Sequence, residues 1–285
     1  MRSASSTAAT AATVPPADAR VLRTRIVSAL ILVPVALVPA GYGPPAWDVL
    51  VAVMGALMAW EWARLCDGGR LSRVGVSSIT IGPVAVVVGL LAGVMPALLL
   101  IGVGVVFVGL GARFEGARNP VWLAAGVAYV GLPCLAMAWL RAMPVDGLAT
   151  LLWVLALVWA TDTGAYIAGR GIGGPKLAPR ISPNKTWAGL AGGVAAAGLI
   201  GAAVALLVEN VDAWVTVPVS GVLALVEQAG DLFESAVKRH FGVKDSSRLI
   251  PGHGGILDRV DGLLAVSLAV AALSGAVGHT ILIWR

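Results

Sequence analysis

The feature that most constrains this chain is a series of apolar stretches, each close to the length that a helix needs to cross a membrane. A transmembrane helix requires about 17–25 predominantly apolar residues. Beyond Arg25 the sequence holds nine such stretches, at approximately 26–43, 46–63, 74–93, 95–112, 121–140, 147–168, 187–208, 213–233 and 262–284. Because backbone polar groups in lipid must be satisfied internally, we predict that each stretch is a helix. The expected fold class is all-α, a polytopic membrane bundle of about nine transmembrane helices.

The composition agrees with this interpretation. Hydrophobic residues make up 58% of the chain and charged residues 12%, whereas about a quarter of the residues in a soluble domain are charged. The net charge of +5 would suggest a nucleic-acid partner only if the basic residues formed a patch, and they are instead spread over the connections between the apolar stretches. We therefore expect no nucleic-acid partner.

Residues 1–22 are rich in Ala, Ser, Thr and Pro and have no apolar periodicity, which predicts a disordered cytoplasmic tail. Residues 23–285 are predicted to form one transmembrane domain. Within this domain, the polar residues that suggest chemistry are concentrated in 147–285.

The basic residues predict the orientation in the membrane. If the N-terminus is cytoplasmic, 18 of the 20 Lys and Arg residues fall in cytoplasmic segments, and only Arg141 and Arg285 fall outside. This asymmetry follows the positive-inside rule and favours an odd number of spans. The two longest cytoplasmic connections, 169–186 and 234–261, then face the same compartment and could build one site.

The stretch Gly230–Gly262 concentrates charge between two apolar segments. Carboxylates lie at both of its ends, and cations and a Gly-rich turn lie between them; these residues are Asp231, Asp258, Asp261, Lys238, Arg239, Lys244, Arg248 and Pro251-Gly252-His253-Gly254-Gly255. Carboxylates with clustered cations are typical of a site for a metal and a phosphate ligand. The cations alone could be topology signals, but acids at membrane depth are expensive and usually functional.

A second polar segment follows the sixth apolar stretch. Asp162, Tyr166 and Arg170 lie one helical turn apart, although Asp162 could also be an acid that a neighbouring helix satisfies. Further on, Ser182-Pro183-Asn184-Lys185-Thr186 stands directly before a predicted helix. A phosphate there would meet free N–H groups, a favourable dipole, hydroxyl donors and a lysine.

These two segments resemble the phosphatidate cytidylyltransferase family, also called CDP-diacylglycerol synthases. The family signature is similar to Ser235, Lys238-Arg239, Lys244-Asp245, Pro251-Gly252-His253-Gly254-Gly255 and Asp258-Arg259-Val260-Asp261, and the segment from Asp162 to Thr186 looks like the family's upstream block. The resemblance covers the C-terminal half, which is expected to be the catalytic half at 147–285. One departure is Ala188, where the family pattern has Glu or Gln.

The resemblance implies a membrane enzyme of phospholipid biosynthesis that converts CTP and phosphatidic acid to CDP-diacylglycerol and pyrophosphate. The expected cofactor is Mg²⁺, one or two ions, held by Asp231 and Asp258 with Asp261 as a third candidate ligand. The catalytic residues expected are Asp231, Asp258, Asp261, Lys238 and Arg239. The residues expected to bind substrate are Tyr166, Arg170, Ser182, Asn184, Lys185, Thr186, Lys244, Asp245, His253 and Arg259. The expected location is the cell membrane, with the active site facing the cytoplasm.

Other functions fit parts of the sequence. A transporter could also place acids within helices, but the sequence shows no internal repeat. Another membrane lipid phosphotransferase, of the CDP-alcohol type, is a closer rival, but its DG…AR…G…D…D pattern is absent. The pairs Gly89/Gly93 and Gly189/Gly193 have the GxxxG spacing, which is compatible with a homodimer.

Overall fold

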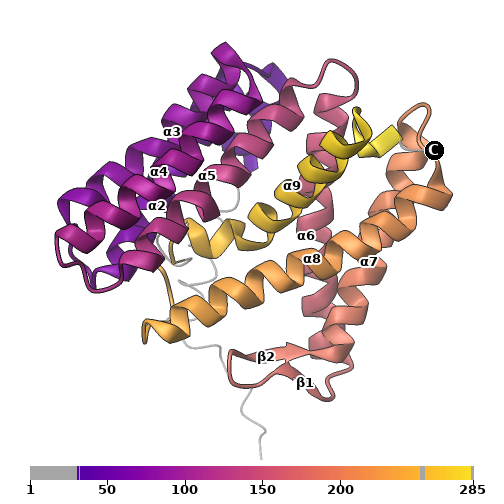
Figure 1. The fold of residues 1–285 in the computed structure, drawn as a ribbon. Helices are drawn as coiled ribbons and strands as arrows, with labels where there is room; N and C mark the ends of the chain where they lie inside the picture. The colour runs from indigo at the N-terminus through magenta and orange to yellow at the C-terminus, as the bar shows by residue number, and fades with distance from the viewer. Residues whose placement is uncertain (1–30, 32, 251–253, 284–285) are drawn as a thin grey trace, which may run out of the picture.

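The computed structural model describes residues 31, 33–250 and 254–283, and most of them lie in helices (Figure 1). Eight helices in this part of the chain are long and apolar enough to cross a membrane. They are α2 (Ala46–Cys66), α3 (Arg73–Ala92), α4 (Val94–Phe114), α5 (Pro120–Ala142), α6 (Gly147–Gly171), α7 (Trp187–Leu207), α8 (Ala213–His240) and α9 (Leu257–Val277). The predicted all-α membrane bundle is therefore confirmed.

The first predicted span is only partly described. A shorter apolar helix, Val33–Tyr42, covers its second half, and most of its first half lies outside the described residues, as does the predicted disordered tail. The Arg141 side chain on α5 donates to the carbonyl oxygens of Ala40 and Gly41, at 2.6 Å and 3.3 Å. These bonds hold the end of the short helix against the end of α5.

The helices form two packed groups (Figure 1). Helices α2 to α5 pack on one another around one apolar core, and α6 to α8 pack around a second. Helix α9 lies between the groups and contacts α5, α6 and α8. Its Leu257 belongs to the first core, whereas its Val266 and Val270 belong to the second.

Glycines allow the close packing of α6 on α7. A Cβ atom on Gly164 would lie 2.6 Å from the carbonyl oxygen of Gly192, and a Cβ on Gly193 would lie 3.1 Å from that of Thr161. A Cβ at Gly164 would force the backbone to shift, and one at Gly193 would be tighter than most Cβ contacts. The predicted GxxxG pair Gly189/Gly193 therefore faces α6 within the chain rather than an open surface.

The facing ends of the last two predicted spans are wrong. Helix α8 continues to His240 and α9 begins at Leu257, so the connection is 241–256 rather than 234–261. Asp261 consequently lies within α9, Asp258 lies in its first turn, and Asp231 lies in α8 as it did in the predicted span. The prediction left Glu234, Lys238, Asp258 and Asp261 outside the spans, but a helix that keeps its charged side chains within the protein can include them.

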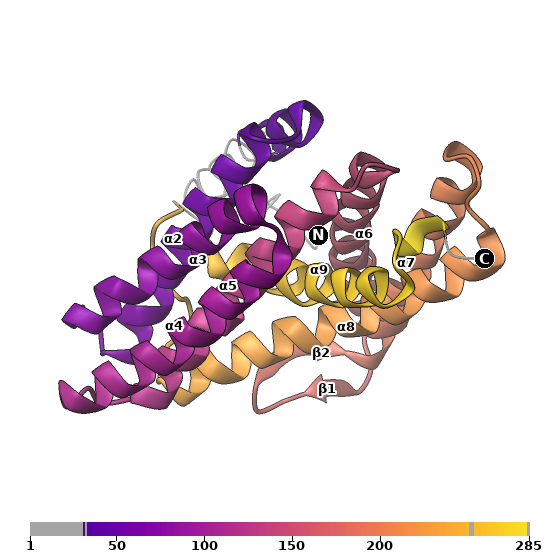
Figure 2. The ribbon, with the colours of Figure 1, turned by 45° about the horizontal axis from the view of Figure 1, so that its top comes forward.

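The connection between α6 and α7 contains two short strands, which the sequence did not predict. Strands β1 (Lys176–Ala178) and β2 (Ser182–Thr186) pair antiparallel, with Lys176 opposite Thr186. In the turned view the two strands lie below α8 (Figure 2).

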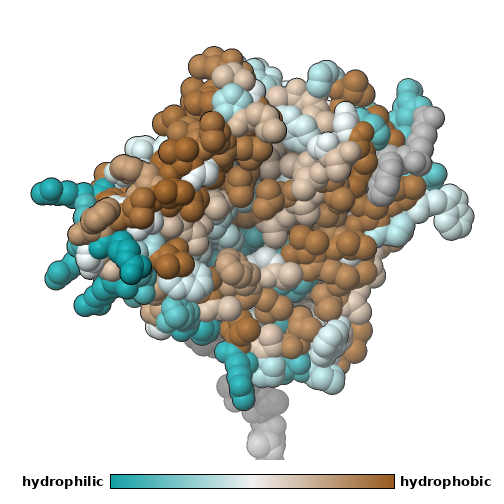
Figure 3. Space-filling model, viewed as in Figure 1, coloured by the Kyte–Doolittle hydropathy of each residue, from teal (hydrophilic) through white to brown (hydrophobic). Residues whose placement is uncertain are grey.

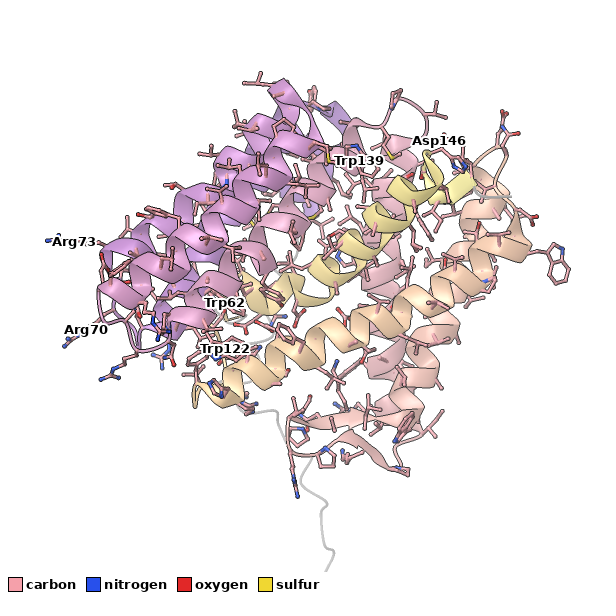
Figure 4. All side chains as sticks on the ribbon, in the orientation of Figure 1. Trp62, Arg70, Arg73, Trp122, Trp139 and Asp146 are labelled. Carbon is pink, nitrogen blue, oxygen red and sulfur yellow. The ribbon has the colours of Figure 1, made fainter. Side chains whose placement is uncertain are left out.

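Strongly hydrophilic side chains lie at the margins of the face seen in Figure 3. They lie along the left and lower margins and again at the upper right, with hydrophobic residues over most of the rest of this face. Arg70 and Arg73 point outward at the left (Figure 4). Asp146 lies at the opposite end. This separation is typical of a membrane protein with one strongly basic side.

Candidate functional site

A polar cavity of about 470 Å³ lies between α6, β2, α7 and α8. Its polar lining residues are Asp162, Tyr166, Arg170, Asn184, Lys185, Thr186, Gln228 and Asp231. Helix α6 supplies the first three, which share one face because they are four residues apart. The Arg170 guanidinium donates to the Tyr166 hydroxyl at 3.1 Å. The structure therefore brings the upstream polar segment and Asp231 of α8 together, whereas no described residue of the predicted connection 234–261 lines this cavity.

Lys185 is the link between the hairpin and α8. Its Nζ lies 2.6 Å from Asp231 Oδ2 and donates to Gln228 Oε1 at 2.9 Å. The Lys185 and Asp231 side chains are 17% and 25% exposed, so both are accessible from the cavity. Asp231 also accepts a hydrogen bond from Ser235, one turn further along α8.

Ser182–Thr186 lies before a helix, as predicted, but as a strand. Thr186 is the N-cap of α7, and its hydroxyl accepts from the Gly189 N–H at 3.0 Å. One of the N–H groups expected to face a phosphate is therefore already satisfied by the chain itself. Lys185 extends toward α8, and phosphate binding by this segment stays a prediction.

A second group of charges surrounds Lys238 at the end of α8. Its ammonium lies 2.8 Å from Glu234 Oε2 and 2.6 Å from Asp258 Oδ1. The other oxygen of Asp258 accepts from the N–H and hydroxyl of Ser246 and from the Gly255 N–H, at 2.8–2.9 Å. Asp258 thus ties α8, the 241–256 connection and the start of α9 together.

Glu61 on α2 is a site residue that the sequence analysis missed. It is 0% exposed and accepts from the main-chain N–H groups of Ile256 and Leu257, at 2.9 Å and 2.8 Å. It also accepts from the Ser246 and Ser247 hydroxyls, at 3.3 Å and 2.5 Å. A carboxylate against the first N–H groups of a helix is favourable because these groups lack partners within the helix and carry the positive end of its dipole. No local signal in α2 identifies these partners, because all of them lie more than 180 residues later.

Two further acids on α8, Glu227 and Glu234, were not predicted as site residues. They are 1% and 2% exposed, and Glu227 accepts from Gln228 Nε2 at 2.6 Å. A signal for them exists, because residues 227, 231, 234 and 238 follow helical spacing and share one face. Ending the predicted span at residue 233 left Glu234 and Lys238 off this face, although Glu227 and Asp231 lay within the span.

The acids partly fit a metal ion. The carboxyl groups of Glu234 and Asp261 lie within hydrogen-bonding reach of each other, and Asp231 interacts with Asp261 electrostatically. Glu234 Oε1 is buried without a donor among the described residues. Facing carboxylates need a shared proton or a cation, and Mg²⁺ prefers carboxylate oxygens. However, no three His, Cys, Asp or Glu side chains of the described residues surround one point, so binding an ion at these residues would require side-chain movement.

Other predicted site residues lie apart from the polar cavity. Lys244 and Asp245 line a larger cavity of about 740 Å³, the loop cavity, together with Arg64 and Arg248. Arg239 is exposed and donates to the Val243 carbonyl at 2.7 Å. Arg259 lines a third, mostly apolar cavity. His253 lies outside the described residues.

Aromatic residues support the α2 side of the site. Trp62 on α2 donates from its indole nitrogen to the Trp122 carbonyl at 2.7 Å, and its ring lies 4.8 Å from that of Tyr129. Trp122 in turn contacts His240 and Phe241 at the end of α8. Figure 4 shows Trp62 and Trp122 close together beside α8. The N-terminal helices therefore brace the end of α8 and the connection that follows it.

Comparison with known proteins finds similarity to cytidylyltransferases over most of the length of this chain. The chain is 40% identical over 256 residues to a protein of Brucella suis named phosphatidate cytidylyltransferase, covering 90% of this chain and 94% of that protein. A protein of the same name from Staphylococcus haemolyticus is 47% identical over 141 residues, covering 49% of this chain and 53% of that protein. The model of the cytidylyltransferase family matches residues 23–276 of this chain. This match includes the five N-terminal spans that sequence motifs left unassigned, and the chain therefore belongs to the cytidylyltransferase family.

Proposed function

We propose that the chain is a phosphatidate cytidylyltransferase, which converts CTP and phosphatidate to CDP-diacylglycerol and pyrophosphate. The names of its relatives support this proposal. The observation that carries it is the polar cavity, where an acid of α6, a lysine of β2 and an acid of α8 meet inside a largely apolar membrane protein. Ionisable groups at such depth are costly and mark functional sites.

In the proposed reaction, a phosphate oxygen of phosphatidate attacks the α-phosphorus of CTP. A new P–O bond forms, the bond between the α-phosphorus and the α,β-bridging oxygen breaks, and pyrophosphate leaves with that bond's electrons. A phosphate monoester is already anionic near neutral pH, so it needs no strong general base. The protein then acts mainly by positioning the phosphates and neutralising their charge.

Lys185 is the proposed main contact to a reacting phosphate. Its ammonium is accessible from the cavity and is held by Asp231 and Gln228. Arg170 and Asn184 line the same cavity and would add donors to the phosphate oxygens. Lys238 is buried between Glu234 and Asp258, so we assign it to fixing these acids rather than to direct substrate contact.

We retain Mg²⁺ as the proposed cofactor. Asp231, Asp261 and Glu234 are the residues that would hold it, because Asp261 interacts electrostatically with both other acids and no described residue donates to Glu234 Oε1. When bound, Mg²⁺ would neutralise charge on the phosphates. Asp258, predicted as a ligand, has both oxygens occupied by Lys238 and the 241–256 connection, and its proposed role is to hold that connection in place.

The two substrates differ in how they reach the enzyme. Phosphatidate stays in the leaflet, whereas CTP arrives from water, so the site must be open to both. The loop cavity, with Arg64, Lys244 and Arg248 in its lining, has the size and charge for part of a nucleotide. We propose the cell membrane as the location and the cytoplasm as the side of CTP entry, following the basic residues of the connections.

Purified protein in detergent tests the proposal directly. With radiolabelled CTP, phosphatidate and Mg²⁺, we expect labelled CDP-diacylglycerol to form with one pyrophosphate per lipid product. Replacing phosphatidate with diacylglycerol removes the attacking phosphate and serves as the control. If folded protein forms no product under these conditions, the proposed function is wrong.

A further inference from the structure

The apolar cavity, which has a volume of about 310 Å³, lies among the short helix Val33–Tyr42, α2, α6 and α9. Among the described residues its lining is apolar except for Arg259, in the first turn of α9. Met54 of α2 and Leu155 of α6 form part of the wall. This cavity differs from the polar cavity both in its position and in its chemistry.

The cavity extends from the lipid-facing surface into the protein. Val35 and Trp159 in its lining are 46% and 42% exposed, on helices that face the bilayer. Leu155 and Ile256, also in its lining, are both 4% exposed. A molecule within the bilayer could therefore enter sideways, between the short helix and α6.

Arg259 is a charged residue in the lining of the apolar cavity. Its guanidinium interacts electrostatically with Asp162, which lines the polar cavity. An anionic group at Arg259 would therefore lie within electrostatic range of the polar cavity. An apolar space with one cation at its polar edge is complementary to an amphiphile with an anionic head and a hydrocarbon tail.

We propose that the apolar cavity holds an acyl chain of the phospholipid substrate, with the lipid's phosphate at Arg259. This inference rests on the proposed function and adds to it the place where the lipid chain binds. Inside a bilayer the chain gains little by leaving lipid for protein, because both surroundings are apolar. The cavity then selects a chain by its length and shape more than it raises affinity for lipids in general.

The test is to fill the cavity and vary the lipid. Leu155→Trp and Met54→Trp each place a larger side chain in the cavity, and we expect the KM for a long-chain phosphatidate to rise about tenfold. The KM for CTP should not change. A short-chain phosphatidate, whose chains do not reach the filled space, should show little loss.

Matched controls exist one turn or one residue away. Leu152 on α6 and Val53 on α2 are 40% and 52% exposed, and neither lines the cavity. Leu152→Trp and Val53→Trp should keep the wild-type KM for both lipids. Leu155→Ala enlarges the cavity and gives a test that does not depend on the folding of the tryptophan variants. It should shift the substrate preference toward phosphatidates with longer or branched chains.

Three results would overturn the inference. They are unchanged KM values in the cavity variants, equal losses with short and long chains, and a loss that appears only with CTP. Retention of long-chain phosphatidate by the detergent-purified protein, measured by native mass spectrometry, gives a readout that needs no turnover. If wild-type protein retains the lipid and Leu155→Trp does not, the cavity holds the chain even should the proposed reaction fail.

Discussion

Lys185 makes two side-chain contacts, which a basic residue that only sets the orientation in the membrane would not need. Its ammonium bonds Asp231 and Gln228 across the gap between the hairpin and α8. Lys185→Ala should lower kcat/KM about ten- to hundredfold, because a charge-assisted contact of about 1.5–3 kcal/mol is lost. Lys185→Arg should keep only part of the wild-type kcat/KM, since the planar guanidinium of arginine directs its donors differently from an ammonium.

Kinetics with CTP and phosphatidate varied in turn measure this effect. A loss confined to one KM identifies the substrate whose phosphate Lys185 contacts. Arg180→Ala, a basic residue of the same hairpin that does not line the polar cavity, is the matched control and should behave as wild type. Unchanged efficiency of Lys185→Ala would contradict the assignment.

Asp231 and Asp258 were predicted to share one role, and the structure separates them. Asp231 is partly exposed to the polar cavity, so Asp231→Asn should lose roughly a hundredfold or more in kcat with little change in thermal stability. Asp258 accepts from Lys238, Ser246 and Gly255. Asp258→Asn should therefore lose activity and also unfold at a lower temperature, because it leaves Lys238 with a weaker partner.

Thermal unfolding in detergent and initial rates for both variants check this difference. A stable, active Asp231→Asn would remove the residue from the mechanism. Equal stability of the two variants would show that the contacts of Asp258 do not contribute to folding.

At the level of single residues, the sequence indicated which polar side chains are candidate site residues. It did not indicate which of these side chains contact one another. Lys185, Asp231 and Asp258 were all identified, yet no pattern indicated that Lys185 bonds Asp231 or that Lys238 bonds Asp258. Such pairs depend on how β2, α8 and α9 pack on one another, and spacing along one helix determines only contacts within that helix. Glu61 was missed for the same reason, since all of its partners lie in another part of the chain.

Among the elements, α2 acts on the site through Glu61, which binds the first turn of α9 and two serines of the 241–256 connection. Glu61→Gln places an NH₂ donor among groups that are themselves donors. Each group left unsatisfied costs about 1–3 kcal/mol. We expect a clear fall in the unfolding temperature and at least about a tenfold loss of kcat/KM.

Glu115→Gln is the control for Glu61. Glu115 also accepts a main-chain N–H, from Val74, but at a longer distance of 3.3 Å and away from the 241–256 connection. Its substitution should leave activity near the wild-type level. If Glu61→Gln is as stable and active as Glu115→Gln, α2 does not organise the site.

Helix positions could largely be predicted, because the bilayer requires apolar stretches of a set length. The break predicted between the spans 74–93 and 95–112 lies at Gly93, whose φ of +92° ends α3 and permits the turn into α4. The predicted ends of α8 and α9 were wrong, since helices can carry charges that the protein itself neutralises. The hairpin was not predicted because strands of three and five residues are too short to show alternation.

For the whole molecule, the distribution of basic residues predicts a cytoplasmic N-terminus and an extracytoplasmic C-terminus. Single cysteines added at each end test this prediction in intact cells. The native Cys66 and Cys134 are both buried, so their background labelling should be low. A membrane-impermeant thiol reagent should label the C-terminal cysteine and spare the N-terminal one until the cells are opened.

Equal labelling of both ends would contradict an odd number of spans. The opposite labelling pattern would keep an odd number but invert the orientation, and it would place the polar cavity on the far side of the membrane from CTP. The measurement therefore tests the orientation independently of any activity assay.

The contact of Glu61 with the start of α9 also sets an order of events during synthesis. Glu61 precedes its main-chain partners by 195 and 196 residues. At about 5–20 residues per second, roughly 10–40 s pass between the synthesis of the acid and that of its partners. During that interval α2 is in the membrane or the insertion machinery with a carboxylate whose native partners do not yet exist. The 241–256 connection can close only when the last helix has been made, so a ribosome that stops short of α9 releases a chain whose site never assembles.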